Sequence, residues 1–139
     1  MKNSEQTLGK LIDRQSTAFI GSLDADGFPN VKAILAPRLR EGLRVFYFTT
    51  KLSSLRVRQY RHDPRACVYF CDRRFFRGVM FRGGMEVLED LENKSRIWRE
   101  SDTLYYPLGL LDPDYCVLRF TAVSGRFYSK FRSEGFTPA

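Results

Sequence analysis

In residues 46–60, FYFTTKLSSLRVRQY, an apolar segment runs directly into hydroxyl-bearing and basic side chains. Aromatic and β-branched residues dominate residues 43–50 and predict a strand. Serine is a favoured N-cap, so we expect a helix to start after Ser53 or Ser54. It should end at about Arg61, because an Asp-Pro pair follows and proline disfavours helical geometry in the residue before it.

The charge at this predicted helix start is unusual. A helix start has unpaired backbone N–H groups and the positive end of the macrodipole, so it favours acidic residues. Residues 43–62 contain no Asp or Glu, whereas the helix expected over residues 90–100 begins with Asp90 and Glu92. The basic residues could form a solvated face, which is usual for a charge run, or they could bind an anion such as a phosphate. The residues that would form such a phosphate site are Lys32, Thr49, Thr50, Lys51, Ser53, Ser54 and Arg56.

The rest of the chain predicts one mainly β domain with helices over residues 1–139, a length suited to a single core. A tight turn at the Asp-Gly pair before Phe28 indicates a hairpin, and the Gly83-Gly84 pair indicates a bulge. Leu91, Ile97 and Trp98 should face inward from the helix over residues 90–100. A further helix is expected over residues 8–14, and strands over residues 16–23, 31–36, 66–71, 78–89, 115–122 and 125–131. Sequential hairpins with helices between some of them favour a small antiparallel barrel.

Composition limits the partners. A net charge of +7 and a pI near 9.6 favour an anionic partner, which leaves nucleic acid, a phosphorylated cofactor and an acidic protein surface open. No apolar run approaches the roughly 20 residues that span a bilayer, so no membrane partner is expected. The first ten residues lack the apolar centre of a signal peptide, which predicts a cytoplasmic protein. Cys67, Cys71 and Cys116 are expected to be reduced, and with only His62 beside them no metal site is expected.

Three segments in order resemble the pyridoxamine 5'-phosphate oxidase-like split-barrel family, in particular its short branch of general stress proteins. They are GFPNVKAILAP (27–37), VFYFTTKLSSLRVRQYRHDPRACVYF (45–70) and RGVMFRGGMEVLED (77–90), and the resemblance covers roughly residues 17–131. It implies an α+β fold with a six- to seven-stranded antiparallel split β-barrel, and a homodimer that binds FMN at its interface. The implied activity is that of an FMN-dependent oxidoreductase acting on a small molecule, and a flavin-binding stress protein without catalysis is the alternative.

The resemblance also implies which residues contact FMN. Ser54 and Arg56 match phosphate contacts, and Ala33 and Ile34 match backbone contacts to the flavin ring. The full implied set is Lys32, Ala33, Ile34, Phe48, Thr49, Thr50, Ser54 and Arg56 from one subunit, with Arg77 and Gly78 from the other. Candidates to line the space over the flavin are Tyr105, Tyr106, Phe127 and Tyr128, for which core or interface packing is an equal alternative. No catalytic residue is identified.

Three departures shape the expected activity. Leu55 stands where true pyridoxamine phosphate oxidases tend to have a second basic phosphate contact, and Gly78 where they carry a polar side chain to the flavin, so weaker phosphate binding is expected. The chain also ends soon after RFYSKF, before the segment that resembles the vitamin B6 phosphate site of those enzymes. We therefore expect a substrate other than pyridoxamine phosphate.

Two other ligands, nucleic acid and haem, are alternatives to a flavin. Basic residues interleaved with aromatic ones over residues 73–77, RRFFR, could bind single-stranded nucleic acid by stacking and phosphate contact. A dimer interface around an anionic cofactor accounts for the same segment, so nucleic acid is the less favoured partner. Haem would need an axial His or Cys, and His62 is expected to be a capping or surface residue.

Overall fold

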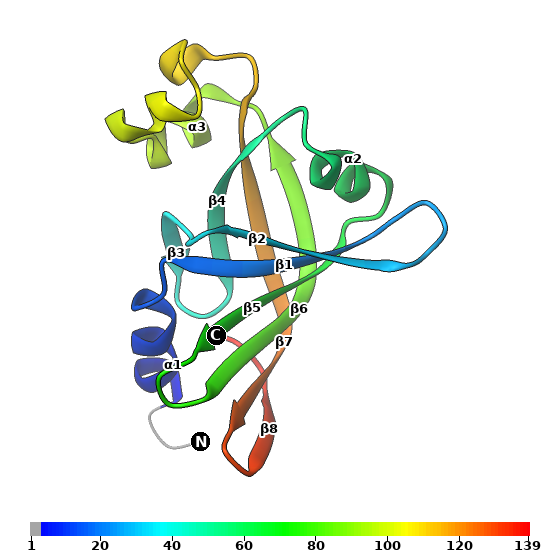
Figure 1. Ribbon diagram of the computed structural model, residues 1–139, viewed down its shortest axis with the longest axis vertical. Coiled ribbons are helices and arrows are strands. Elements are labelled where there is room, and N and C mark those ends of the chain that lie inside the picture. Colours follow the sequence, from blue (N-terminus) through cyan, green and yellow to red (C-terminus); the bar gives the residue numbers. More distant parts are fainter. Residues whose placement is uncertain (1–3) are drawn as a thin grey trace.

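The computed structural model describes residues 4–139 and has an α+β fold built on one antiparallel sheet of eight strands (Figure 1). The helices are α1 (Ser4–Asp13), α2 (Leu55–His62) and α3 (Leu91–Ile97), followed by the short 3-10 helices η1 (Glu100–Leu104) and η2 (Gly109–Leu111). The strands are β1 (Thr17–Leu23), β2 (Pro29–Leu35), β3 (Leu39–Glu41), β4 (Val45–Lys51), β5 (Arg65–Asp72), β6 (Arg77–Leu88), β7 (Tyr115–Ser129) and β8 (Arg132–Phe136). No helix in this part of the chain is long and apolar enough to cross a membrane.

The sheet is strongly bent but does not close. Its strand order is β2-β1-β5-β6-β7-β4-β3, and β8 pairs with β7 away from this path. In Figure 1 the β1–β2 hairpin crosses the long β5, β6 and β7 strands at a steep angle. The predicted antiparallel split barrel is therefore confirmed, with eight strands in place of the expected six or seven.

The last third of the sheet differs from the sequence prediction. Residues 115–129 form one continuous strand, whereas two strands had been expected there. Gly125 does not break β7, because this position makes room for an aromatic ring: a Cβ there would lie 2.5 Å from the ring of Phe136 on β8. Strand β8 itself was not predicted. The predicted bulge is confirmed, since the pairing of β6 with β7 shifts between Arg82 and Gly83.

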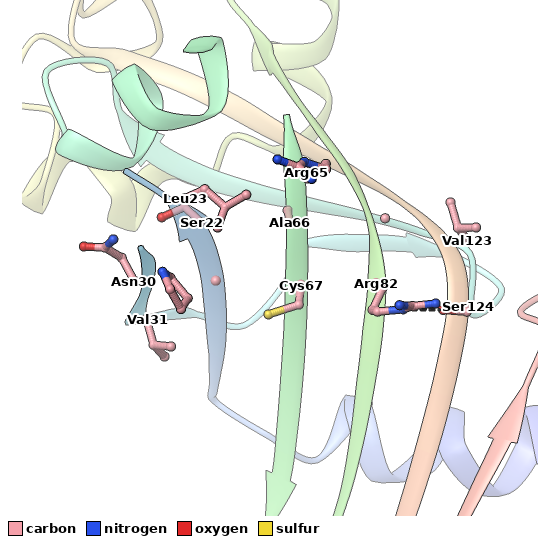
Figure 2. Close-up of a pocket in the computed structure, with 13 residues that line it drawn as sticks. Ser22, Leu23, Asn30, Val31, Arg65, Ala66, Cys67, Arg82, Val123 and Ser124 are labelled. Carbon is pink, nitrogen blue, oxygen red and sulfur yellow. Dashed lines mark hydrogen bonds between the residues drawn. The ribbon is translucent and has the colours of Figure 1, made fainter. Parts of the chain in front are cut away.

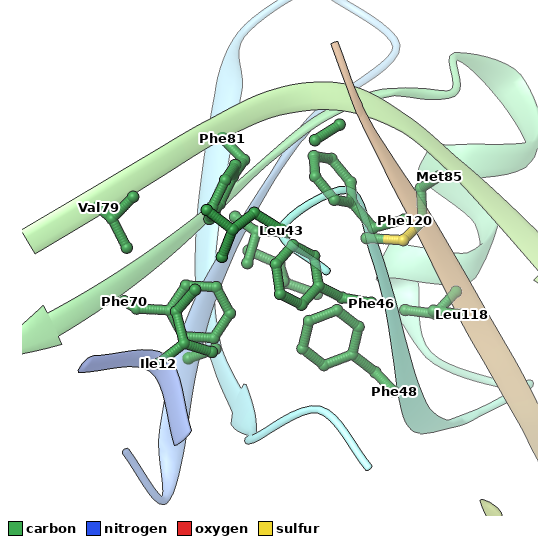
Figure 3. Packing of buried hydrophobic residues seen from close by; sticks show 14 of the residues in the cluster. Ile12, Leu43, Phe46, Phe48, Phe70, Val79, Phe81, Met85, Leu118 and Phe120 are labelled. Carbon is green, nitrogen blue, oxygen red and sulfur yellow. The ribbon is translucent and has the colours of Figure 1, made fainter. Parts of the chain in front are cut away.

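The main core lies inside the bent sheet and is rich in phenylalanine. The ring of Phe46 on β4 lies 5.4 Å from that of Phe70 and 5.2 Å from that of Phe81, measured between centroids (Figure 3). Helix α1 adds Leu8, Leu11 and Ile12, each at most 1% exposed. Burial of these large apolar side chains is the main force that holds β4 against β5 and β6.

A second, smaller core lies on the opposite face of β4. It consists of Tyr47, Ile97, Tyr106, Tyr115 and Val117. Successive side chains of a strand point to opposite faces, so Phe46 and Phe48 enter the main core while Tyr47 enters the second one. Ile97 is buried as predicted, but Leu91 is 56% exposed, so its predicted inward position is wrong: it is the first residue of a short helix that turns only one face to the sheet.

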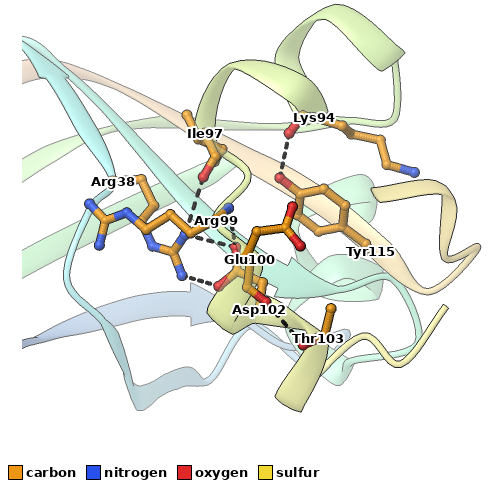
Figure 4. A network of polar contacts seen from close by, with 8 residues as sticks. All are labelled: Arg38, Lys94, Ile97, Arg99, Glu100, Asp102, Thr103 and Tyr115. Carbon is orange, nitrogen blue, oxygen red and sulfur yellow. Dashed lines mark hydrogen bonds and ion pairs between the residues drawn. The ribbon is translucent and has the colours of Figure 1, made fainter. Parts of the chain in front are cut away.

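A buried ion pair fixes the second core to the rest of the sheet (Figure 4). Arg38 donates from Nη1 to Asp102 at 2.8 Å and to the carbonyl oxygen of Ile97 at 3.1 Å, and its Nη2 also donates to Asp102. The two side chains are 9% and 2% exposed. The pair therefore ties the segment before β3 to η1, although the two are 64 residues apart in sequence.

Candidate functional site

The start of α2 is capped as the sequence predicts. Ser54 has extended backbone geometry, and its Oγ accepts a hydrogen bond from the backbone N–H of Val57 at 3.3 Å. No acidic residue lies in the first turn of the helix. The positive end of this helix is therefore not neutralised from within its own sequence.

A residue that the sequence prediction missed fixes the loop before α2. Asp114 accepts hydrogen bonds from the backbone N–H of Ser53 at 2.8 Å and from its hydroxyl at 3.0 Å. The carbonyl oxygen of Asp114 also accepts from the backbone N–H of Leu52 at 2.7 Å. Nothing in the local sequence links these residues, because 61 positions separate Ser53 from Asp114. The carboxylate holds the loop and leaves Ser54 to cap the helix.

Arg56 differs from the other basic residues of α2. Its Nε atom is buried and has no hydrogen-bond partner within residues 4–139. Arg58 and Arg61 are exposed, and Arg61 forms an ion pair with Glu89 at 2.6 Å. The interpretation as a solvated basic face therefore describes Arg58 and Arg61 but not Arg56.

The charge of Arg56 lies near the hydroxyl of Tyr60. Burial raises the pKa of Tyr60 well above its ordinary value, and Arg56 partly counters this rise. The Tyr60 hydroxyl donates to the carbonyl oxygen of Gly21 at 2.9 Å, and Ser22 donates a short hydrogen bond to Gln59. These bonds hold α2 against the end of β1.

The predicted flavin-ring contacts lie on the hairpin partner of β1. Lys32, Ala33 and Ile34 occupy β2, at one end of the strand order. Lys32 pairs with Ile20 and shares the inner face of the sheet, whereas Ala33 pairs with Phe19 and shares the outer face. Lys32 and Ala33 are exposed, and Ile34 packs against the main core.

The three predicted residues of β4 do not present their side chains to one place. Phe48 is fully buried in the main core, so only its backbone is available to a ligand. Thr49 points the other way, towards Tyr106 and the second core, and is 9% exposed. Thr50 is half-buried on the same face as Phe48, at the end of β4 that leads into α2.

Arg77 and Gly78 lie far from this group within one chain. Gly78 pairs with Cys71 near the end of β5, whereas Gly84 pairs with Arg65 at the start of β5, just after α2. Gly78 and Gly84 are six residues apart on β6. Six residues of strand span about 20 Å. Arg77 donates to Asp72 at 2.7 Å, while its Nε atom is buried without a partner among the described residues. Their expected contribution from a second subunit stays a prediction.

The four aromatic candidates are also dispersed. Tyr106 is buried in the second core, and Tyr105 beside it is 44% exposed. Phe127 packs against the main core, and Tyr128 faces outward, pairing with Gly78. Within one chain the structure does not bring these four rings together.

A separate cavity of about 410 Å³ lies on the outer face of the sheet (Figure 2). It crosses β2, β1, β5, β6 and β7, and none of the ten residues expected to bind FMN lines it. Its lining residues are Gly21, Ser22, Leu23, Pro29, Asn30, Val31, Arg65, Ala66, Cys67, Arg82, Gly83, Val123 and Ser124.

Metal-ligating residues do not gather in the described part of the chain. No group of three or more His, Cys, Asp and Glu side chains there could hold a metal ion. His62 is exposed in the last turn of α2, and Cys67, Cys71 and Cys116 are free thiols. Burial raises the pKa of Cys116 to about 12, so this thiol is protonated and unreactive at neutral pH.

Together, the open antiparallel barrel and the capped, acid-free start of α2 define a split-barrel protein with a candidate anion site. A family model described as pyridoxamine 5'-phosphate oxidase matches residues 4–129. The chain belongs to this family, within the branch of general stress proteins related to general stress protein 26.

Solved structures share this fold. A protein from Clostridium acetobutylicum related to general stress protein 26 of B. subtilis is 31% identical, with a TM-score of 0.90, over 99% of this chain and 96% of that one. General stress protein 26 from Bacillus anthracis is 17% identical, with a TM-score of 0.80, over 97% and 98%. A heme binding protein from Mycobacterium smegmatis is 17% identical, with a TM-score of 0.72, over 91% of this chain and 55% of that one. No curated protein matches the sequence significantly.

Proposed function

We propose that this protein is a flavoprotein that binds FMN at a homodimer interface, with the FMN phosphate at the start of α2. The observation that carries the proposal is the buried, unpartnered Nε of Arg56 beside the Ser54 cap. A buried donor without a partner is unfavourable, and a phosphate oxygen would supply the acceptor that it lacks.

The rest of the helix start suits the same ligand. Backbone N–H groups and the helix dipole favour an anion at this end, and the first turn has no carboxylate to compete with it. Lys32 lies on the inner face of β2. Strand β1 pairs with β2 and is hydrogen-bonded to α2 through Ser22 and Gln59, so β1 links β2 to α2. Lys32 and Arg56 would hold the phosphate, and the β2 backbone at Ala33 and Ile34 would lie along the flavin ring.

An exposed apolar surface supports the second subunit. On the outer face of β1 and β2, Phe19 is 37% exposed, Val31 71% and Leu35 44%. Phe19 pairs with Ala33, and Val31 and Leu35 lie two residues to either side of Ala33 on β2, so the three side chains share one face of the hairpin. Monomeric proteins seldom expose such a patch without a partner. In the dimer, Arg77 and Gly78 would approach the FMN of the other protomer.

A bound flavin would supply the redox chemistry, while the chain's own residues place it and control access to it. We assign the protein an oxidoreductase activity on a small molecule other than pyridoxamine phosphate, with a flavin-binding stress protein without turnover as the alternative. A cytoplasmic location accords with its three unpaired thiols.

Haem fits the described residues less well. An axial ligand is commonly His or Cys. His62 lies at the end of α2, Cys67 and Cys71 lie on β5 and Cys116 lies on β7, so none of them is at the start of α2. The donors there are a guanidinium, hydroxyls and backbone N–H groups, which suit a phosphate.

Two substitutions on one helix test the proposal. Arg56→Gln should weaken FMN binding by about tenfold or more, because it removes a charged hydrogen bond to the phosphate. Arg58→Gln removes the same charge from the exposed face and should leave the affinity nearly unchanged. Riboflavin, which lacks the phosphate, should bind both variants and the wild type alike. Equal FMN affinity for both variants would contradict a phosphate site at Arg56.

A further inference from the structure

The structure places a second basic and aromatic loop beside the RRFFR segment. Residues 73–76 connect β5 to β6 directly after the Asp72–Arg77 pair, and residues 130–131 connect β7 to β8 after the Ser129–Arg132 pair. Strands β6 and β7 are neighbours, and Gly78 pairs with Tyr128. Both turns therefore leave the sheet at the same end, at the bottom of Figure 1. We call residues 73–76 and 130–132 together the basic-aromatic tip.

The basic residues of this tip are available to a ligand. Arg73, Arg74, Lys130 and Arg132 are all exposed, and none forms an ion pair within residues 4–139. Two carboxylates are near: Asp72 is held by Arg77, and Glu134 follows two residues after Arg132 on β8. The tip therefore carries a net positive charge.

Each turn also exposes a phenylalanine. Phe131 is 94% exposed and Phe76 is 79% exposed, the two highest values among the large exposed apolar residues. Phe76 has a φ of 51°, the only positive φ of a non-glycine residue in the described chain. A bulky residue in this region is strained, and such strain persists chiefly at functional positions. Burial in this chain does not explain either ring.

A cavity of about 310 Å³ lies between the two turns. It is lined by Phe75, Arg77, Ser129, Lys130, Phe131 and Arg132. Arg74 and Arg77 lie over the ring of Phe75, at 5.2 and 5.0 Å from its centroid. The cavity lining thus combines two aromatic rings, Phe75 and Phe131, with the basic side chains of Arg77, Lys130 and Arg132.

We propose that the basic-aromatic tip binds single-stranded nucleic acid, with bases stacked on Phe76 and Phe131 and phosphates held by Arg73, Arg74, Lys130 and Arg132. Aromatic rings that accept bases, set among cations that follow the backbone, are the usual features of such sites. From the sequence, nucleic acid is the less favoured partner because a dimer interface around an anionic cofactor accounts for the RRFFR segment. The second loop adds a third exposed ring, Phe131, and two further cations, Lys130 and Arg132, and it lies outside the proposed FMN phosphate site.

Fluorescence anisotropy of a labelled oligouridylate of about 15 nucleotides, near the upper end of known site sizes, tests this proposal on the full-length protein. Phe76→Ala with Phe131→Ala should weaken binding by about tenfold or more, because stacking is lost. Arg73→Gln with Arg132→Gln should also reduce the slope of log affinity against log salt by about 1.4, the value for two phosphate contacts on a single strand.

Matched variants elsewhere provide the controls. Phe28→Ala removes a ring that is 69% exposed on the β1–β2 turn, and Arg14→Gln with Arg44→Gln removes two exposed charges outside the tip. These variants should bind the oligonucleotide like the wild type, and all variants should keep the wild-type circular dichroism. Equal losses in the tip and control variants would overturn the proposal, since they would show only a non-specific charge effect. Binding to phosphatidylserine vesicles that depends on Phe76 and Phe131, without such dependence for the oligonucleotide, would overturn it in favour of a lipid surface.

Discussion

Ser53 donates two hydrogen bonds to Asp114, one from its backbone N–H at 2.8 Å and one from its hydroxyl at 3.0 Å. This contact joins the loop before α2 to the start of β7, so the position of the candidate phosphate site depends on a residue far away in sequence. The negative charge of Asp114 would weaken the binding of an anion at this site. Its hydrogen bonds to Ser53 would strengthen that binding by holding the loop in place, and the net effect depends on which contribution is larger.

Asp114→Ala separates these two effects. We expect it to lower the free energy of unfolding by about 1 kcal/mol, the usual contribution of a lost hydrogen bond, and to weaken FMN binding because the loop is released. Asp26→Ala, at an exposed position of the β1–β2 turn, is the control. Isothermal titration with FMN provides the measurement. Tighter binding by Asp114→Ala would show that its charge, and not its hold on Ser53, dominates.

Leu55→Glu tests why the start of α2 has no acid. Leu55 is 42% exposed in the first turn, so a glutamate there would interact favourably with the helix dipole. The flavin-free protein should gain about 0.3–1 kcal/mol in unfolding free energy, while FMN binding should weaken through repulsion of the phosphate. Urea denaturation and FMN titration measure the two effects. Greater stability with unchanged FMN affinity would mean that the helix start is merely solvated.

Asp102→Asn should break the buried ion pair with Arg38. Removing one partner leaves the other charge buried, so we expect a loss of about 3 kcal/mol in unfolding free energy. Asp13→Asn, in the exposed pair with Arg40, should cost less than about 1 kcal/mol. Denaturant titrations of both variants at neutral pH make the comparison. An equal loss of unfolding free energy in Asp102→Asn and Asp13→Asn would show that burial of the Arg38–Asp102 pair has no energetic consequence.

The same pair predicts an acid dependence. Burial acts to raise the pKa of Asp102, but hydrogen bonds from Arg38 and from the Arg99 backbone outweigh it, so the net pKa is lowered. A lowered carboxyl pKa stabilises the fold above the unfolded value of about 3.9, and this contribution is lost as the pH falls through the folded pKa. The wild type should therefore lose stability below about pH 4, and Asp102→Asn should lose less over that range. An equal loss of unfolding free energy with falling pH in the wild type and in Asp102→Asn would contradict this prediction.

The adjacent glycines of β6 should respond differently to alanine. A Cβ on Gly83 would clash with the carbonyl oxygen of Thr121, whereas a Cβ on Gly84 would meet nothing within 4 Å. Gly83→Ala should lower the melting temperature, at a cost of about 1–3 kcal/mol, and Gly84→Ala should leave it nearly unchanged. A harmless Gly83→Ala would mean that the bulge does not need its glycine.

Local sequence signals predicted the elements that depend on local chemistry. The strand at Phe46, the Ser54 cap and the bulge at Gly83 each follow from residue types within a few positions. Local signals did not predict that β7 is continuous, because a glycine such as Gly125 normally interrupts a strand pattern. Only the packing of Phe136 over Gly125 explains why a glycine stands there. Leu91 was misplaced for a similar reason, since a seven-residue helix gives too little periodicity to fix its inner face.

The candidate site was predicted in part. The composition of α2 showed that its start lacks acid, but only the structure separates the buried Nε of Arg56 from the exposed side chain of Arg58. Asp114 could not be found from the sequence, because the contact depends on how β7 begins beside the loop. For the same reason, the second basic loop at Phe131 was not associated with the RRFFR segment.

The most direct test of the flavin proposal is the visible absorption spectrum of freshly purified protein, with chromatographic identification of the molecule released on denaturation. A flavin spectrum and stoichiometric release of FMN are the predicted result, and Arg56→Gln should reduce the amount released while Arg58→Gln does not. A colourless protein that also fails to bind added FMN would contradict the phosphate site at the start of α2.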